Sequence, residues 1–303
     1  MRIDIQDNFL NLFITVFKDK PLECDNRLNA FMLKITNNSF NYNNLKEELE
    51  NAMITYALSR HTYDELITQR KFGNLYSRAR EQFRKAESNL GELGELLLYC
   101  LLEAHLKAPK LLTKLELKTA PNDYVKGADG VHLLKIDKDT YQIIFGESKL
   151  RPDLTDGISD AFSSIKTMLK EGLEKITYEI HLVNSNLLKE NVSDEKSYEV
   201  LKKILVPTEN DEDLNVDYSF GIFLGFDFPI SDCERRLNNI EFRKKMKQKV
   251  EDAINEKIPQ INKQLKKEQF IGYNFYFYIV PFYELDKIRK QIIADLKLVF
   301  RTS

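Results

Sequence analysis

The residue types around one short stretch of the chain suit metal-assisted hydrolysis of a phosphodiester. Asp129 precedes an apolar run, and Glu147 and Lys149 close the next apolar run. Magnesium prefers hard oxygen ligands and keeps several waters, so one or two carboxylates and a substrate phosphate suffice to hold it. A lysine beside such a site can orient water or stabilise developing negative charge. Asp129 and Glu147 are therefore candidate metal ligands, and Lys149 is their candidate catalytic partner.

A β-hairpin would bring these side chains together. The two apolar runs flank the turn-forming sequence Asp137-Lys138-Asp139, a pattern typical of antiparallel strands joined by a turn. In a hairpin centred on Lys138, Asp129 faces Glu147, and directly opposed residues lie roughly 4.5–5.5 Å apart. Residues two apart on a strand share a face, so Lys149 joins Glu147 where the carboxylates meet.

An apolar helix predicted from about residue 88 onward adds two acids. Glu92 and Glu95 are three residues apart and share one helical face. Gly91 and Gly94 each cost up to about 1 kcal/mol in a helix, which indicates close packing at both positions. Glu95, with Glu92 as the alternative, is the candidate helix carboxylate of the site. The positive helix N-terminus alone would also explain both acids.

Other residues compete with this interpretation. Glu116 and Lys118 repeat the Glu-x-Lys spacing on a predicted strand but lack an opposed acid. The spacing between His132 and Asp129 places the histidine on the opposite face, which favours a core or surface role. The plainest alternative for the main motif is a surface ion pair between Glu147 and Lys149.

The elements that must position these residues follow the order helix, three strands, helix, strand. A strand at residues 111–119 precedes the hairpin, and an amphipathic helix at 156–171 follows it. Uninterrupted apolar runs at 218–226 and 270–282 are typical of strands buried on both faces. We therefore expect an α/β fold with a mixed central sheet flanked by helices.

The flanking regions are less regular. The first 40 residues predict short strands or edge elements, and charged helices are expected at residues 44–60, 75–88, 185–205 and 234–267. Arginines and lysines crowd the second of these helices and two runs, 243–247 and 263–267. A solvated helix face is the favoured interpretation of the first cluster, with phosphate contact as the alternative. The two runs suit either DNA or a protein partner.

Composition excludes several classes of protein. The chain has 303 residues, of which 43% are hydrophobic and 30% charged, and its net charge is −2. No apolar run approaches the roughly 20 residues of a membrane span, and acidic residues interrupt the N-terminus at once, so we expect a cytoplasmic protein. Three scattered cysteines fit neither a disulfide framework nor a zinc site. The near-neutral charge counts mildly against a standalone nucleic-acid binder.

The motifs carry a family resemblance. Gly91-x-x-x-Glu95 on a helix, Asp129 opening a strand and Glu147-x-Lys149 closing the next strand resemble the restriction-endonuclease-like, or PD-(D/E)xK, superfamily. Ala128 stands where the superfamily name has proline, and no glutamine motif is evident in the following helix. The stretches Asn-Leu-Gly-Glu-Leu-Gly-Glu, Gly-Ala-Asp-Gly-Val-His and Phe-Gly-Glu-Ser-Lys resemble more closely the HamA family, the nuclease subunit of Hachiman anti-phage defence.

The resemblance covers about residues 88–170 and sets further expectations. It implies an Mg²⁺-dependent DNA nuclease, with Mn²⁺ as a substitute, restrained by a partner superfamily 2 helicase of the HamB type and released on infection. It also implies a nuclease-like domain at residues 86–303, with residues 1–85 as an N-terminal elaboration packed on that core. A catalytically weak DNA-binding scaffold for the helicase is the alternative, and a site-specific restriction endonuclease ranks last.

Overall fold

The computed structural model describes residues 2–85, 91–113, 115, 127–173, 192, 195–205 and 214–297. Several predictions fall outside these residues. They concern Glu116, Lys118, the end of the strand predicted at 111–119, the first residues of the helix predicted from about residue 88, and most of residues 185–194.

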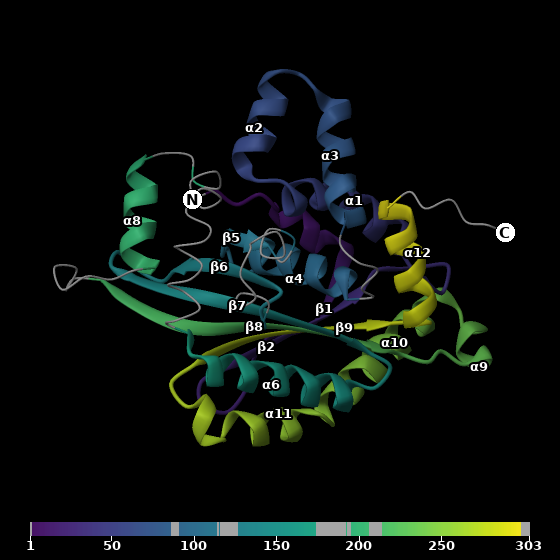
Figure 1. The fold of residues 1–303 in the computed structure, drawn as a ribbon. Helices are drawn as coiled ribbons and strands as arrows, with labels where there is room; N and C mark the ends of the chain where they lie inside the picture. Colours follow the sequence, from purple (N-terminus) through teal and green to yellow (C-terminus); the bar gives the residue numbers. More distant parts are fainter. Residues whose placement is uncertain are drawn as a thin grey trace.

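A seven-stranded mixed sheet lies at the centre, with the strand order β1-β2-β9-β8-β7-β6-β5 (Figure 1). Its strands are β1 (Phe13–Pro21), β2 (Arg27–Leu33), β5 (Lys110–Thr113), β6 (Gly130–Lys135), β7 (Thr140–Arg151), β8 (Asn215–Asp227) and β9 (Asn274–Phe282). Strands β7, β8, β9 and β2 run parallel to one another, whereas β1, β6 and β5 pair antiparallel with their neighbours. A separate small ladder joins β3 (Ile35–Thr36) and β4 (Ser39–Phe40). The predicted α/β class is confirmed.

Helices cover both faces of the sheet (Figure 1). Helix α4 packs on β7 and β8 from one face, and α6 packs on the same two strands from the other. The helices are α1 (Tyr42–Ala57), α2 (Arg60–Thr68), α3 (Phe72–Lys85), α4 (Glu92–Ala104), α6 (Leu154–Glu171), α8 (Glu195–Leu205), α9 (Asp232–Arg235), α10 (Asn239–Asn255), α11 (Ile258–Leu265) and α12 (Leu285–Lys297), with 3-10 turns η1 (Asp7–Leu12) and η3 (Glu268–Phe270). The predicted order of helix, three strands, helix and strand corresponds to α4, β5, β6, β7, α6 and β8 and is confirmed.

The central strands are apolar on both faces because each face is covered by a helix. Phe220, Ile222 and Phe223 of β8 are fully buried, as is Phe277 of β9. Helix α4 approaches the sheet closely over β8. A Cβ built on Gly221 would lie 3.0 Å from the side chain of Leu102, so this position has no room for a side chain unless α4 shifts.

Local structure departs from the predictions in four places. The predicted helix at 234–267 is three helices. Asn238 caps the start of α10 after α9 has ended, and Pro259 in the first turn of α11 separates α11 from α10. Strand β9 starts at Asn274, since η3 precedes it. Helices α2 and α12 were not predicted, because neither is long or strongly apolar. Strand β2 is interior and not an edge, since β9 pairs with it.

A buried network of four charged residues ties the N-terminus to α2, α4 and β5. We call this group, Asp4, Arg60, Glu103 and Lys110, the anchoring network. Arg60 Nε lies 2.9 Å from Asp4 Oδ2, and Arg60 Nη2 lies 3.4 Å from Glu103 Oε1. Lys110 Nζ donates to the Leu58 carbonyl at 2.9 Å, just beyond the end of α1. Two acids and two bases therefore balance one another in the interior.

Candidate active site

The β6–β7 hairpin has the predicted register. Its pairs run from Lys135 with Tyr141 to Gly130 with Gly146, all equidistant from Lys138. The Asp129 amide then donates to the Gly146 carbonyl at 2.8 Å, so Asp129 lies with Gly130 against Gly146, as in a β-bulge. The regular pairing ends there, and the predicted pairing of Asp129 with Glu147 does not form. The turn closes as an Asx turn, with Asp137 Oδ1 accepting from the amides of residues 139 and 140.

Asp129 is held by a residue that the sequence did not single out. The Ser148 amide donates to Asp129 Oδ2 at 2.7 Å, and Ser148 Oγ donates to the same oxygen at 2.6 Å. Both residues are buried. Charge-assisted bonds of this length are strong, so the Asp129 carboxylate is fixed in orientation at the end of the hairpin.

Glu147 and Lys149 form an ion pair on β7, as their shared face predicted. The Glu147 side chain is 3% exposed, whereas the Lys149 side chain is 22% exposed. Burial, followed by the nearby Asp129 charge, raises the pKa of Glu147 to about 7, against the opposing effects of Lys149 and a side-chain hydrogen bond with Ser164 of α6. Glu147 is therefore a carboxylate whose negative charge is only partly compensated by the protein.

Helix α4 brings two buried acids to the other face of the sheet. Lys297 Nζ of α12 lies 2.7 Å from one Glu92 oxygen and 3.0 Å from the other. Glu95 Oε2 instead accepts from the Tyr56 hydroxyl at 3.4 Å. Glu92 thus has a cationic partner and Glu95 a phenolic one.

Tyr56 marks where Asp129 and the α4 acids come near one another. Burial raises the pKa of the Tyr56 hydroxyl well above its ordinary value, and the charges of Glu95, Asp129 and Glu92 raise it further. The phenol therefore stays protonated and can act as a donor between buried carboxylates. No sequence signal pointed to this residue, which lies on α1 far from the motifs.

The acids approach from two faces of the sheet. Gly146 and Ser148 of β7 face α4. A Cβ built on Gly146 would lie 3.0 Å from Leu98 of α4, and a Cβ built on Gly94 of α4 would lie 3.0 Å from Ser148 Oγ. Glu147 alternates with them and faces α6, where Ser164 lies. Asp129, at the end of β6, is the acid that interacts with both groups. Among the described residues, no three Asp, Glu, His or Cys side chains already form a metal cage.

The donor set nevertheless fits a hard divalent cation. Asp129 and Glu147 supply two carboxylates against the single positive charge of Lys149. Magnesium requires few protein ligands because it retains waters and shares substrate phosphates. We refer to Asp129, Glu147 and Lys149 as the hairpin site.

Three neighbouring predictions had different outcomes. Close packing at Gly94 is confirmed. For Gly91 the prediction stays untested, since residues 86–90 beside it lie outside the described residues and the nearest described atom to a Cβ there would be Oε1 of Glu95 at 3.4 Å. His132 faces away from the hairpin site as predicted. It is buried, its Nδ1 lies 2.8 Å from the Ala108 carbonyl oxygen, and burial lowers its pKa to about 4. It is a neutral core histidine.

The basic runs lie on exposed faces of α10 and the end of α11, on the α6 side of the sheet (Figure 1). Arg243 Nε donates to the Ile35 carbonyl at 3.3 Å, so this arginine takes part in packing α10 on the N-terminal region.

Comparison with protein families decides the relationship of the chain. The HamA family model matches residues 7–296. The chain belongs to the HamA family. This HamA chain is therefore a component of Hachiman anti-phage defence. Neither the curated proteins nor the solved structures gave a match. In the described part of this HamA chain, no helix is both long and apolar enough to cross a membrane.

Proposed function

We propose that this HamA chain is a metal-dependent DNA nuclease of the PD-(D/E)xK type and the effector of its defence system. The observation that supports this most is the hairpin site, where Asp129 and Glu147 are both buried, the Asp129 charge contributes to the raised pKa of Glu147, and Lys149 pairs with Glu147. Buried carboxylates with excess negative charge are costly for a fold and are retained where a cation or reaction needs them.

Each residue has a role in the proposed reaction. Asp129, oriented by Ser148, and Glu147 would hold Mg²⁺ or Mn²⁺, with Glu95 beyond Asp129 as a further carboxylate. When bound, the ion supplies Lewis-acid neutralisation of the phosphate charge. Lys149, which is partly exposed, orients the attacking water and stabilises the negative charge that develops on the phosphate. The products are a 5′ and a 3′ DNA end, one of which carries the phosphate.

Regulation completes the proposal. A HamB-like superfamily 2 helicase restrains the nuclease until infection damages or exposes DNA. Net charge supports external control, since a chain of charge −2 has a weak intrinsic electrostatic attraction to DNA. A partner can therefore supply most of the affinity for DNA.

The test is plasmid cleavage by the purified chain, alone and with its helicase. Supercoiled plasmid is incubated with Mg²⁺, Mn²⁺ or EDTA, and Glu147→Ala and Lys149→Ala are compared with wild type. Glu116→Ala is the matched control, because it alters the same Glu-x-Lys spacing elsewhere in the sequence. The proposal expects metal-dependent loss of plasmid with wild type and Glu116→Ala alone. Equal cleavage by the hairpin-site variants would refute it.

A second function follows from the absence of a three-ligand metal cage among the described residues. In this alternative the chain is a catalytically weak DNA-binding subunit that serves as a scaffold for the helicase. It expects DNA binding that survives Glu147→Ala, and plasmid that stays intact even with helicase, ATP and damaged DNA present.

A further inference from the structure

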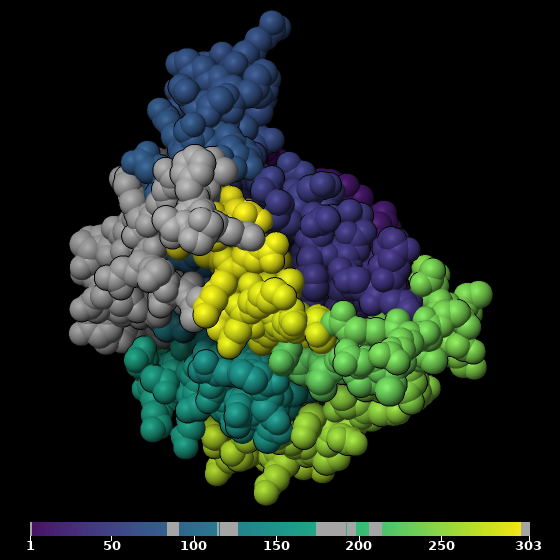
Figure 2. All heavy atoms as spheres, turned by 90° about the vertical axis from the view of Figure 1, so that its right-hand side faces the viewer, coloured from purple at the N-terminus to yellow at the C-terminus, as the bar shows by residue number. Residues whose placement is uncertain are grey.

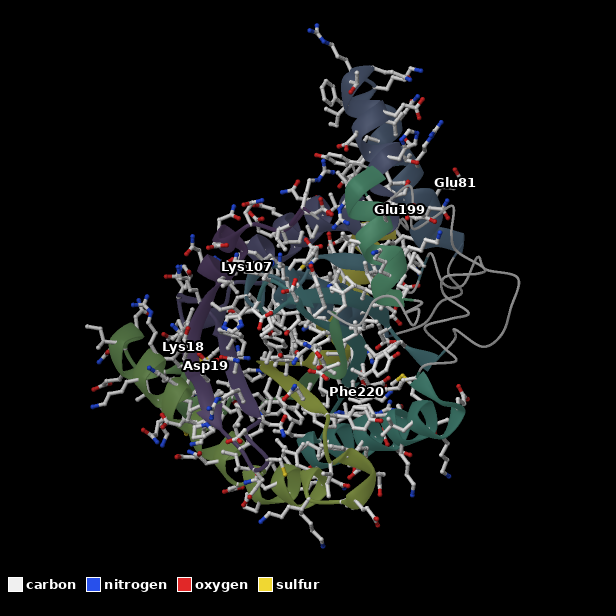
Figure 3. All side chains as sticks on the ribbon, turned by 90° about the vertical axis from the view of Figure 1, so that its left-hand side faces the viewer. Lys18, Asp19, Glu81, Lys107, Glu199 and Phe220 are labelled. Atoms are coloured by element: carbon white, nitrogen blue, oxygen red, sulfur yellow. The ribbon has the colours of Figure 1, made fainter. Side chains whose placement is uncertain are left out.

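Helices α2 and α3 form a hairpin that stands out from the rest of the molecule on the α4 side of the sheet (Figures 1 and 2). The two helices pack on each other, and α3 also packs on α1. Leu66, Leu75 and Phe83 are buried in these contacts. By contrast, every residue from 69 to 74 is exposed, and Figure 3 shows side chains of the free end extending into solvent. We call residues 69–74 the hairpin tip.

The hairpin tip carries a large aromatic side chain in water. Phe72 is 61% exposed. Only four large hydrophobic side chains among the described residues are exposed, and the other three are isoleucines. The planar faces of an aromatic ring stack on nucleic-acid bases, which aliphatic side chains do not do.

The segment that carries this phenylalanine has a surplus of positive charge, and two of its basic residues directly precede the ring. Residues 61–85 contain six arginines and lysines and three acids, whereas the whole chain is slightly acidic. Two of those acids are engaged, since Asp64 pairs with Arg2 at 2.8 Å and Glu65 accepts from Gln69 at 2.9 Å. Arg70 and Lys71 are exposed and form no ion pair with any described residue. The hairpin tip is thus an aromatic group within a basic surface.

Arg70 occupies a backbone conformation that normally selects glycine. Its φ is +54°. The amides of Arg70 and Lys71 donate to the carbonyls of Ile67 and Leu66 at 2.9 and 2.8 Å, which is the Schellman arrangement that ends a helix with a left-handed residue, usually glycine. An arginine here keeps a charged side chain at a conformational cost.

We propose that the hairpin tip binds DNA with unpaired bases, with Phe72 stacked on a base and Arg70 and Lys71 against the adjacent phosphates. An aromatic ring flanked by cations is the combination by which proteins hold single strands. The uncompensated positive charge favours this polyanion over a protein surface. The inference rests on the proposed nuclease function for its substrate and adds a preference for single-stranded or frayed DNA.

The experiment measures DNA binding separately from cleavage. Full-length protein carrying Glu147→Gln is titrated in EDTA against a fluorescent single strand and against a blunt duplex of the same sequence, at several salt concentrations. Phe72→Ala is expected to weaken single-strand binding about tenfold, by loss of one stacked base, and duplex binding less. Arg70→Gly is expected to weaken both and to lower the salt slope on the single strand by about 0.7, the value for one phosphate contact.

The variants are chosen so that misfolding cannot imitate the result. Glycine fits the φ of Arg70, so Arg70→Gly should melt no lower than wild type. Ile240→Ala is the matched control for Phe72→Ala, because Ile240 is 77% exposed on α10. Lys138→Ala controls for charge, because its side chain is 91% exposed at another hairpin turn. Both controls should bind as wild type does.

The outcomes separate this inference from the nuclease proposal. If wild type cuts plasmid while the tip variants bind both DNAs unchanged, the hairpin tip is not the DNA contact and the nuclease proposal stands. If tip variants lose single-strand binding but wild type never cuts, the inference stands and the nuclease proposal falls. If the Glu147→Gln protein without a tip substitution binds neither DNA, the inference falls, and plasmid cleavage with the helicase present decides the nuclease proposal separately. Unchanged DNA binding with lost helicase binding would overturn the inference in favour of a protein interface.

Discussion

Two buried groups of charged residues, the anchoring network and the hairpin site, differ in how fully their carboxylates are satisfied. In the anchoring network, Glu103 accepts from the amides of Asp4, Ile5 and Lys110 at 2.6–2.9 Å and from Arg60 at 3.4 Å. Both of its acids pair with Arg60, and the ammonium of its second base, Lys110, donates to a main-chain carbonyl. Such a group is self-contained and holds elements together.

The hairpin site has fewer donors for its charge. Among the described residues, Glu147 interacts with Lys149 and Ser164, and Asp129 adds a second negative charge. Burial raises the pKa of both Glu103 and Glu147, so a raised pKa does not by itself distinguish a structural acid from a functional one. The charges around the two acids differ, which is consistent with a structural role for the anchoring network and with the chemical role proposed for the hairpin site.

Neutralising Glu147 is the strongest test of the difference between the anchoring network and the hairpin site. Glu147→Gln should reduce plasmid cleavage about a thousandfold or more, because a metal ligand and transition-state charge are lost. The fold should survive, since removing an incompletely paired buried charge relieves repulsion from Asp129. Cleavage assays and thermal melts measure the two effects. A variant that melts far below wild type would show that Glu147 is structural.

The converse substitution belongs to the anchoring network. Arg60→Ala leaves Asp4 and Glu103 without their shared guanidinium, and breaking a buried pair in this way costs about 3–5 kcal/mol of unfolding free energy. Urea denaturation measures the loss. Arg151→Ala, at an exposed pair with Asp160, is the control and should cost less than about 1 kcal/mol. A cost for Arg60→Ala as small as that of the control would remove the distinction between the two regions.

Ser148 tests whether orientation of Asp129 matters to the hairpin site. Ser148→Ala removes the hydroxyl donor and keeps the amide donor. Loss of such a supporting contact weakens metal affinity about 10–100-fold, so the Mg²⁺ concentration for half-maximal cleavage should rise while cleavage at saturating Mg²⁺ changes less. Ser163→Ala on α6 is a control, because its side chain is not part of the site. An unchanged Mg²⁺ requirement would assign Ser148 to packing alone.

The smallest expected effect is on the pH dependence of stability in EDTA. The folded pKa of Glu147, about 7, lies above its ordinary value of 4.5, so the folded state binds more protons between these values and stability is lost as pH rises through about 7. Melting temperature should therefore fall across this window, and Glu147→Gln should flatten the slope. Mg²⁺ should oppose the fall, because the ion binds the ionised form. A steeper slope in the variant would contradict the assignment.

The sequence by itself determined the relationships between residues within the β6–β7 hairpin, through the periodicity of the strands. A centred turn and alternation of side chains predicted the pairing of β6 with β7 as far as Gly146 and placed Glu147 beside Lys149, because these relationships depend only on residues within one hairpin. They did not predict that Asp129 lies against Gly146 instead of Glu147. The same reasoning placed His132 on the other face. The order of helices and strands around β6 and β7 could also be predicted from the sequence, since it depends only on the period of the apolar residues and on the length of each segment.

Tertiary structure alone decided what surrounds that hairpin. The choice between Glu92 and Glu95 depends on Lys297 and Tyr56, which lie far away in sequence and arrive through the packing of α12 and α1 against α4. The anchoring network likewise joins distant segments, and its arginine and acids read individually as ordinary surface charges. Long-range contacts of this kind depend on how helices dock on the sheet, and side-chain periodicity carries no information about which distant residue completes a buried pair.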